Sequence, residues 1–179
     1  AIDEQDYFEL VMQTASKALR EFMAGKPQTG KIYEIEQPDV PLWAVWSIQQ
    51  YAKFAGRDKC SQMYGKLLEE IIHYIIDGKH PNLRLDDNGL LYSNGRDKAV
   101  TWMNSTAYGR PVVPRSGYIV EFNALWYNAL KFCASIAKDN GREKEAEELE
   151  DIAKTSGESF VDTFLNEYGY LFDYVDGNM

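Results

Sequence analysis

The sequence is poor in the residue types that build metal, redox and nucleic-acid sites. It has two cysteines, Cys60 and Cys133, and two histidines, His73 and His80, and their spacing fits neither a metal-ligand motif nor a disulfide framework. The 19 basic residues form no cluster and the formal net charge is −9, which argues against nucleic-acid or anionic-membrane binding. The sequence therefore predicts no metal site, no nucleic-acid partner and no membrane partner.

Long apolar runs are also missing. None reaches the length of a transmembrane helix, and no signal peptide is recognisable. The chain starts AIDEQDYF, without an initiator Met, so we expect that an upstream segment has been removed. Localisation stays open on these grounds, with the cytoplasm favoured over secretion.

The remaining composition is that of a globular protein with many aromatic residues. Of the 179 residues, 45% are hydrophobic and 26% charged, which favours one domain or a large piece of one. The aromatic share of 13% suits the apolar faces of sugars, but it suits a thick helical core equally well. Composition alone leaves both interpretations open.

Apolar residues at helical spacing predict about five helices. The expected ranges are about 5–23, 41–56, 57–77, 120–140 and 143–166. Asp39 is well placed to cap the second helix, and Trp43, Trp46 and Phe54 wrap around it, so we expect that helix to be largely buried. Cys133 falls in the stripe of the fourth helix and is expected to be an inert core thiol.

Between the third and fourth helices the pattern changes to alternation of apolar and polar residues. This alternation surrounds Asp87-Asn88-Gly89 and predicts a β-hairpin near 83–92. No strand–helix–strand repeat follows, so the fold class is all-α, with antiparallel helical hairpins as in a solenoid or part of an α/α toroid. No short motif recurs at a fixed period, which disfavours a tetratricopeptide-like solenoid.

The stretch Thr101–Asn128 concentrates groups that can hold a polar ligand. Two Trp, three Tyr, two Arg, three Asn and one Glu lie within it. Prolines and glycines break its first half, whereas the half from Val120 onward predicts a helix. A polar, aromatic loop that leads into a buried helix is a common way to build a binding site. The alternative is a long surface loop with a few aromatic residues tucked under it.

Within this stretch, TWMN, RPVVPRSG and VEFNALWYNAL resemble the signature of the glucosidase domain of glycogen debranching enzymes (amylo-α-1,6-glucosidases). The family pattern reads roughly TWMD, PVTPR-x-G and VEINALWYNAL. Two flanking pieces agree: DVPLWAVWSIQQYAKFAG resembles the family's Asp-x-x-Leu-Trp helix, and GYLFDYVDG resembles its GYLYDVVDG strand. The resemblance spans about Glu34 to Gly177.

The resemblance implies an (α/α)₆ toroid that hydrolyses single α-1,6-linked glucose stubs of a trimmed glycogen branch with inversion. Such chemistry uses two carboxyl groups roughly 6.5–9.5 Å apart, one as general acid and one as general base for a water. It implies no metal and no organic cofactor. The implied partner is a branched α-glucan such as glycogen or limit dextrin.

Carried over residue by residue, the match is uneven. The family's general acid is the Asp of TWMD, and Asn104 stands there; an amide cannot donate that proton. Substrate-binding roles are implied for the following residues: Trp102, Arg115, Glu121, Asn123 and Asp39. Alternatives remain for several of them: Asp39 as a helix cap, and Arg115 as a partner that only holds the loop to Glu121. Trp126 is expected in the core rather than against a ligand.

The family's general base and its upstream Gly-x-x-Gly-Arg-Asp segment are not found in this sequence, so we expect 1–179 to be a single partial domain, inactive alone. Its exposed helix faces predict self-association or reduced stability. Two hypotheses follow. Either the parent is an active glucosidase, with Asp97 or another acid replacing Asn104, or the chain is a non-catalytic glucan-binding or scaffolding homologue. A helical protein-interaction module unrelated to sugars is the third reading.

Overall fold

The computed structural model describes residues 3–29 and 34–176. Gly177, at the end of the last family-like motif, lies outside them. The helices of this part are α1 (Glu4–Met23), α2 (Asp39–Ala55), α3 (Arg57–Ile76), α4 (Val120–Asp139) and α5 (Glu143–Phe164). They agree closely with the five predicted helices. None of these described helices has the length and hydropathy needed to cross a bilayer.

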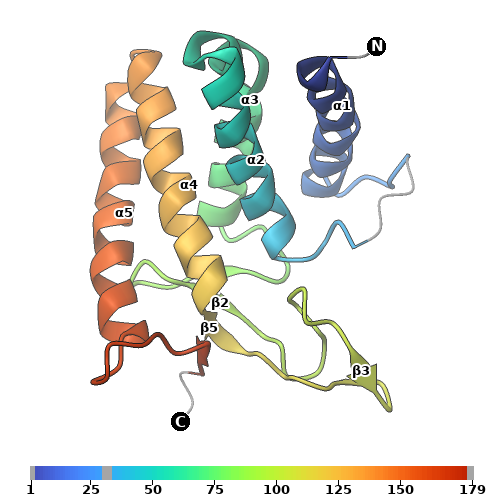
Figure 1. Cartoon of the computed structure of the whole chain (residues 1–179), viewed down its shortest axis with the longest axis vertical. Helices are drawn as coiled ribbons and strands as arrows, with labels where there is room; N and C mark the ends of the chain where they lie inside the picture. Colours follow the sequence, from blue (N-terminus) through green and yellow to red (C-terminus); the bar gives the residue numbers. More distant parts are fainter. Residues whose placement is uncertain (1–2, 30–33, 177–179) are drawn as a thin grey trace.

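Two antiparallel helical hairpins form the body of the molecule. α2 turns into α3 at Gly56, whose φ of +88° is readily adopted only by glycine. α4 turns into α5 through Asn140–Arg142, where Gly141 has a φ of +72°. α4 packs most extensively on α5, and α2 packs on α3 and α4 (Figure 1). The N-terminal ends of α2 and α4 therefore lie at the same end of the molecule, beside the loops and strands.

A small antiparallel sheet lies at that end. Its strand order is β1-β2-β5-β6, formed by β1 (Arg84–Leu85), β2 (Leu91–Ser93), β5 (Gly117–Ile119) and β6 (Tyr174–Val175). The pairing of β1 with β2 confirms the predicted hairpin. The prediction of an otherwise all-α chain was too narrow, because the sheet also contains β5 and β6. These strands have only 3 and 2 residues, and they pair although they are far apart in sequence. Strands this short carry no periodic signal.

A second, two-stranded ribbon extends away from the body. It consists of β3 (Thr106–Ala107) and β4 (Arg110–Pro111), joined by a turn at Tyr108-Gly109. Figure 1 shows this ribbon projecting from the lower end of the molecule, beyond the helices. The loop that contains the family-like motif is thus partly pinned to the sheet and partly extended toward solvent.

The core lies between the helical hairpins. α2 contributes Leu42, Val45 and Ile48, and these pack with buried aliphatic residues of α3 and with Trp126 of α4. The expectation that α2 is largely buried was wrong for one face, since Trp43, Trp46 and Phe54 are exposed, Phe54 at 85%. Their spacing places them on the side of α2 turned away from α3 and α4. Trp126 is fully buried, as expected for a core residue.

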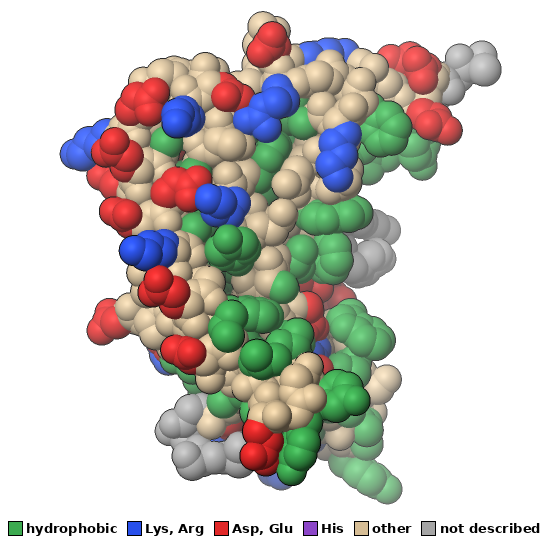
Figure 2. Space-filling view, turned by 60° about the vertical axis from the view of Figure 1, so that its left-hand side comes forward, with side chains coloured by type: hydrophobic (Ala, Val, Ile, Leu, Met, Phe, Trp, Pro, Cys, Tyr) green, Lys and Arg blue, Asp and Glu red, His purple; other side chains and the backbone are tan. Residues whose placement is uncertain are grey.

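Apolar side chains are also exposed on the α4–α5 side. Figure 2 shows them gathered over the lower half of that face, while charged side chains dominate its upper left part. The exposed large apolar residues on and after these helices include Tyr127, Val161, Leu165, Tyr168, Tyr170, Leu171 and Phe172. This surface is compatible with the predicted self-association, which stays a prediction.

Both cysteines are buried and free. Burial raises the pKa of the Cys60 thiol to about 11 and raises that of Cys133 as well. Both thiols are therefore protonated at neutral pH and unreactive, as expected for Cys133.

Candidate functional site

An arginine between two carboxylates occupies the end of the molecule where α4 begins. The Arg115 Nη1 and Nη2 atoms donate to the two Glu121 carboxylate oxygens at 2.5 and 2.6 Å. Its Nε and Nη2 atoms donate to the Asp173 carboxylate at 2.9 and 2.6 Å. We call Arg115, Glu121 and Asp173 the Arg115 cluster. Every nitrogen of the guanidinium is occupied by these two carboxylates.

Short strands bring the three residues together. Arg115 precedes β5, Glu121 lies in the first turn of α4, and Asp173 precedes β6. β5 pairs with β6, and the Val120 backbone N–H donates to the Asp173 carbonyl at 3.1 Å. This pairing holds Asp173 beside the start of α4, although it is 52 residues (173 − 121) from Glu121 in sequence.

Two glycines allow the backbones to approach closely here. A Cβ on Gly95 would lie 1.7 Å from the Arg115 carbonyl oxygen, and one on Gly117 would lie 2.2 Å from the Val175 carbonyl oxygen. Gly117 also has a φ of +100°. The position of Arg115 therefore depends on close backbone packing on both sides of it.

The Arg115 side chain is 2% exposed, yet it carries a charge. Burial alone disfavours the charged form, but the hydrogen bonds from Glu121 and Asp173 outweigh it, so the net shift of the Arg115 pKa is upward. The guanidinium stays charged and fixed. The alternative reading in which Arg115 holds the loop to Glu121 is therefore present in the structure. Whether Arg115 and Glu121 also contact a sugar stays a prediction.

Asp39 lies near this cluster at the start of α2. The expectation that it caps the helix was wrong: the N-cap position belongs to Pro38, and no side chain caps the helix. The Val40 N–H donates instead to the Gln37 carbonyl of the preceding turn at 3.2 Å. Burial raises the pKa of the Asp39 carboxyl, and the negative charge of Glu121 raises it further.

Asn123 is a fully buried link between α4 and the sheet. Its Oδ1 accepts from the Leu91 N–H at 2.7 Å, and its Nδ2 donates to the Leu91 and Ile119 carbonyls at 3.1 and 3.0 Å. The amide thus pairs with the backbone of β2 like an additional strand residue. This burial argues against direct sugar contact, because no polar atom of the side chain is left to face a ligand. Its implied role in binding stays a prediction.

Trp102 and Asn104 lie in the other part of the loop, before the β3–β4 ribbon. Trp102 is 71% exposed, and Asn104 is exposed too. The loop is anchored behind them by Thr101, which is buried and whose Oγ1 accepts from the Met103 N–H at 3.2 Å. An exposed indole on an anchored loop is free to stack on the flat face of a sugar.

Comparison with known proteins bears on this arrangement. A profile of the amylo-alpha-1,6-glucosidase family matches residues 25–179, which is most of the chain. The chain belongs to the amylo-alpha-1,6-glucosidase family. No individual curated protein matches it at a significant level. The match includes both the Arg115 cluster and the exposed loop, so the resemblance read from the sequence motifs is confirmed.

One residue of the site was missed by sequence reasoning. Asp173 lies within GYLFDYVDG, a segment identified by its likeness to an amylo-alpha-1,6-glucosidase strand, yet no role was assigned to it. The signal available was an acidic residue inside an otherwise apolar, aromatic strand, which needs a partner or a function. The structure supplies Arg115 as that partner.

The other acid considered from the sequence, Asp97, is exposed on the loop before the family-like motif. Its neighbour Arg96 pairs with Asp176 at 2.6 Å, which ties this loop to the end of β6. Four hollows on the described surface lie between helices or at helix ends, and none of these four is lined by a residue of the predicted substrate site.

One group of described residues has the arrangement of possible metal ligands, although the sequence spacing predicted none. Glu69, His73 and Glu145 place one ligand atom each within 4.8 Å of one another. Arg142 already lies among them, with Nη1 at 3.2 Å from Glu69 and 2.5 Å from Glu145. A fixed cation beside these carboxylates opposes binding of a metal ion.

Proposed function

We propose that this chain is the glucan-binding part of a debranching-type glycoside hydrolase whose substrate is α-1,6-linked glucose on a branched α-glucan. The observation that carries the proposal is the family match over residues 25–179. The antiparallel helical hairpins are compatible with part of an (α/α)₆ toroid, in which loops at one end form the site. Here the N-terminal ends of α2 and α4, the Arg115 cluster and the loop with Trp102 share one end.

In this proposal some residues of the loop contact the sugar and others hold the loop in place. Trp102 stacks on a glucose ring, and Asn104 donates or accepts a hydrogen bond from a sugar hydroxyl. The Arg115 cluster fixes the base of the loop and holds Glu121 at the helix start. Glu121 and Asp173 are both engaged by Arg115, so each is suited to orient neighbouring groups.

Inverting hydrolysis requires a proton donor, which the Asn104 amide cannot be. Among the described carboxyl groups, Asp39 is partly buried, and this burial raises its pKa, the direction that favours a general acid. Asp97 is exposed and lacks that burial. Asp39 is therefore the better proposed substitute for the acid within the described chain.

A second candidate function is a glucan-binding homologue without catalysis. Asn104 favours it directly, because Asn has nearly the shape of Asp and keeps a hydrogen bond while removing proton donation. Both candidates bind the same class of ligand, and they differ only in turnover.

Glucose release from a branched limit dextrin by the complete parent protein tests the proposal, comparing the form with Asn104 with Asn104→Asp and Asp39→Asn. Asn94→Asp serves as the control, since it makes the same chemical change at another exposed loop position. Activity with Asn104 that is lost in Asp39→Asn supports Asp39 as the acid. Activity only in Asn104→Asp supports an intact glucosidase site without its acid.

Dextrin binding without turnover in any variant supports the second candidate. Absence of both binding and glucose release in all variants contradicts the glucan assignment itself.

A further inference from the structure

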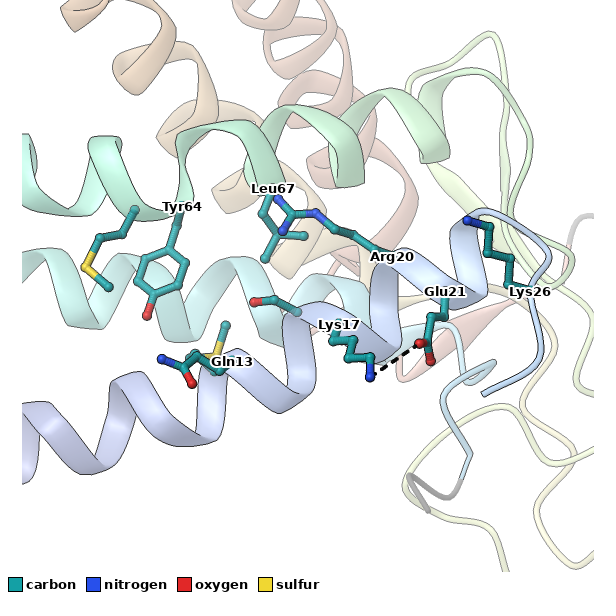
Figure 3. Close-up of a pocket in the computed structure, with 10 residues that line it drawn as sticks. Gln13, Lys17, Arg20, Glu21, Lys26, Tyr64 and Leu67 are labelled. Atoms are coloured by element: carbon teal, nitrogen blue, oxygen red, sulfur yellow. Dashed lines mark ion pairs between the residues drawn. The ribbon is translucent and has the colours of Figure 1, made fainter. Parts of the chain in front are cut away.

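A hollow of about 460 Å³ lies between α1 and α3, away from the Arg115 cluster. Figure 3 shows its walls: Gln13, Lys17, Arg20 and Glu21 come from α1, while Tyr64 and Leu67 come from α3. Lys26, in the segment after α1, closes one end. The hollow has the size of a small-ligand site rather than of a packing defect.

Two buried hydroxyl groups line this hollow without a hydrogen-bond partner among the described residues. Ser16 is 9% exposed and Tyr64 is 6% exposed, and neither Ser16 Oγ nor Tyr64 Oη has a partner there. In Figure 3 the Tyr64 hydroxyl points from α3 into the space toward α1. A buried hydroxyl without a partner costs stability, so two of them on one hollow call for a ligand that hydrogen-bonds to them.

Positive charge gathers at the rim. Lys17, Arg20 and Lys26 line the hollow together with one acid, Glu21, and the Nε atom of Arg20 pairs with Glu70 of α3 at 2.7 Å, so the three cations face two acids. Glu21 accepts from the Thr29 N–H and hydroxyl at 2.9 and 2.8 Å and lies 3.9 Å from Lys17. Lys26 forms no ion pair with any residue in the part of the chain that the structure describes. This local excess of positive charge occurs in a chain whose net charge is −9.

Part of the lining is apolar. Met12, Met63 and Leu67 form this part, and the Met63 side chain is partly exposed, so it is able to turn aside. Methionine side chains adapt to flat apolar groups and make favourable contacts with aromatic rings. The hollow therefore combines hydroxyl groups, apolar side chains and cations in one lining.

We propose that this hollow binds a small organic anion: an apolar or aromatic body with a phosphate or carboxylate group. The anionic group lies at Lys17, Arg20 and Lys26, the body lies against Met12 and Met63, and a polar atom of the ligand reaches Ser16 or Tyr64. The proposal is independent of the glucan site, which lies at the other elements of the chain.

Phenyl phosphate and phenylacetate are the probes, measured by calorimetric titration against the protein, with inorganic phosphate and benzyl alcohol as partial ligands. We expect at least one of the two aromatic anions to bind about tenfold more tightly than either partial ligand. Tighter binding of phenyl phosphate identifies the anionic group as phosphate, and tighter binding of phenylacetate identifies it as carboxylate. Equal affinity for inorganic phosphate, or no binding of either aromatic anion at millimolar concentration, overturns the proposal.

Ser16→Ala separates a ligand role from a structural one. Because Ser16 Oγ has no described partner, the variant is expected to keep or raise the melting temperature of the free protein. Its affinity for the probe is expected to fall about threefold to fivefold. Ser156→Ala is the matched control: Ser156 Oγ is also buried and without a described partner, but it lies on α5 and does not line the hollow. Equal probe affinity in the two variants overturns the proposal.

Lys26→Met tests the rim in the same way. The variant is expected to lower the affinity for the aromatic anion about threefold and to leave the affinity for benzyl alcohol unchanged. Lys144→Met, at an exposed position on α5, is the control for lost charge. A loss of the same size in Lys144→Met means that net charge alone drives binding, which overturns the site.

Discussion

Two parts of the loop between β2 and α4 differ in solvent exposure, although they are close in sequence. At the α4 end, the Arg115 side chain is 2% exposed and held by Glu121 and Asp173. In the part of the loop from Trp102 through the β3–β4 ribbon, which we call the Trp102 end, Trp102 is 71% exposed and the ribbon projects into solvent. Both ends belong to one family-like motif. Burial therefore separates the motif residues that fix the loop from those that stay exposed to solvent.

The physical cause of the difference is backbone packing. Gly95 and Gly117 let neighbouring chain segments approach the Arg115 end within a distance that excludes any Cβ. In the turn of the β3–β4 ribbon, by contrast, a Cβ on Gly109 would meet no atom within 4 Å. The predictions below probe the fixed end, the buried body and the exposed end, from the largest expected effect to the smallest.

Arg115→Met should destabilise the protein most, by about 3–4 kcal/mol, since it removes the buried cation that pairs with Glu121 and Asp173 and leaves the partly buried Glu121 carboxylate unpaired. Chemical denaturation measures this free energy of unfolding. The control is Arg110→Met in the exposed ribbon, expected to change it by less than about 0.5 kcal/mol. Equal stability of the two variants would mean that Arg115 does not hold the loop.

His80 should make stability depend on pH. Burial lowers the pKa of His80 to about 4, against an unfolded value near 6.5, so the folded protein favours neutral imidazole. The stabilisation is complete above about pH 6.5 and is lost as the pH falls toward 4, amounting to about 3 kcal/mol. Unfolding titrations between these values should show a steep loss that His80→Phe flattens.

Gly95→Ala should cost about 2 kcal/mol, because its Cβ would lie 1.7 Å from the Arg115 carbonyl oxygen and force the two backbones apart. Gly65→Ala in α3 is the matched control, since its Cβ meets only Ser61 Oγ at 3.5 Å. That control should stabilise the helix by about 0.5–1 kcal/mol. Thermal unfolding measures both changes in stability. A loss in Gly95→Ala and a gain in Gly65→Ala would support the contrast between packed and open glycines, whereas changes of the same sign would contradict it.

Trp102→Ala should have the smallest effect on stability, within about 0.5 kcal/mol, because its indole is exposed. Its affinity for a branched α-glucan should nevertheless fall about fivefold through loss of the stacking face. Glucan titration followed by tryptophan fluorescence measures this. Phe54→Ala, another exposed aromatic at the far end of α2, should leave glucan affinity unchanged. A comparable loss in Phe54→Ala would point to nonspecific contact.

Much of the fold could be predicted because its signals are local. Helical periodicity gave the five helices, and Asp87-Asn88-Gly89 gave the hairpin. β5 and β6 could not be predicted, since strands of 3 and 2 residues depend on pairing with each other and with β2. Trp43 and Trp46 were expected to be buried because a helix rich in aromatics looks the same in sequence whether or not a neighbour covers it.

The candidate site was predictable in composition but not in role. The motif identified Arg115, Glu121 and Asn123, but Asn123 proved to be a backbone link and Asp39 was not a cap. Both outcomes depend on which groups lie next to the side chain in the folded chain. The link from Arg115 to Asp173 crosses 58 residues, and no local pattern encodes it.

The central claim is that the fixed Arg115 end presents the exposed Trp102 end to a glucan. Hydrogen exchange with and without branched limit dextrin tests it most directly. The account predicts that dextrin slows exchange in residues 101–113, that Trp102→Ala removes this protection, and that α1 and α3 are unaffected. Unchanged exchange in 101–113, or protection confined to other elements while dextrin is bound, would contradict it.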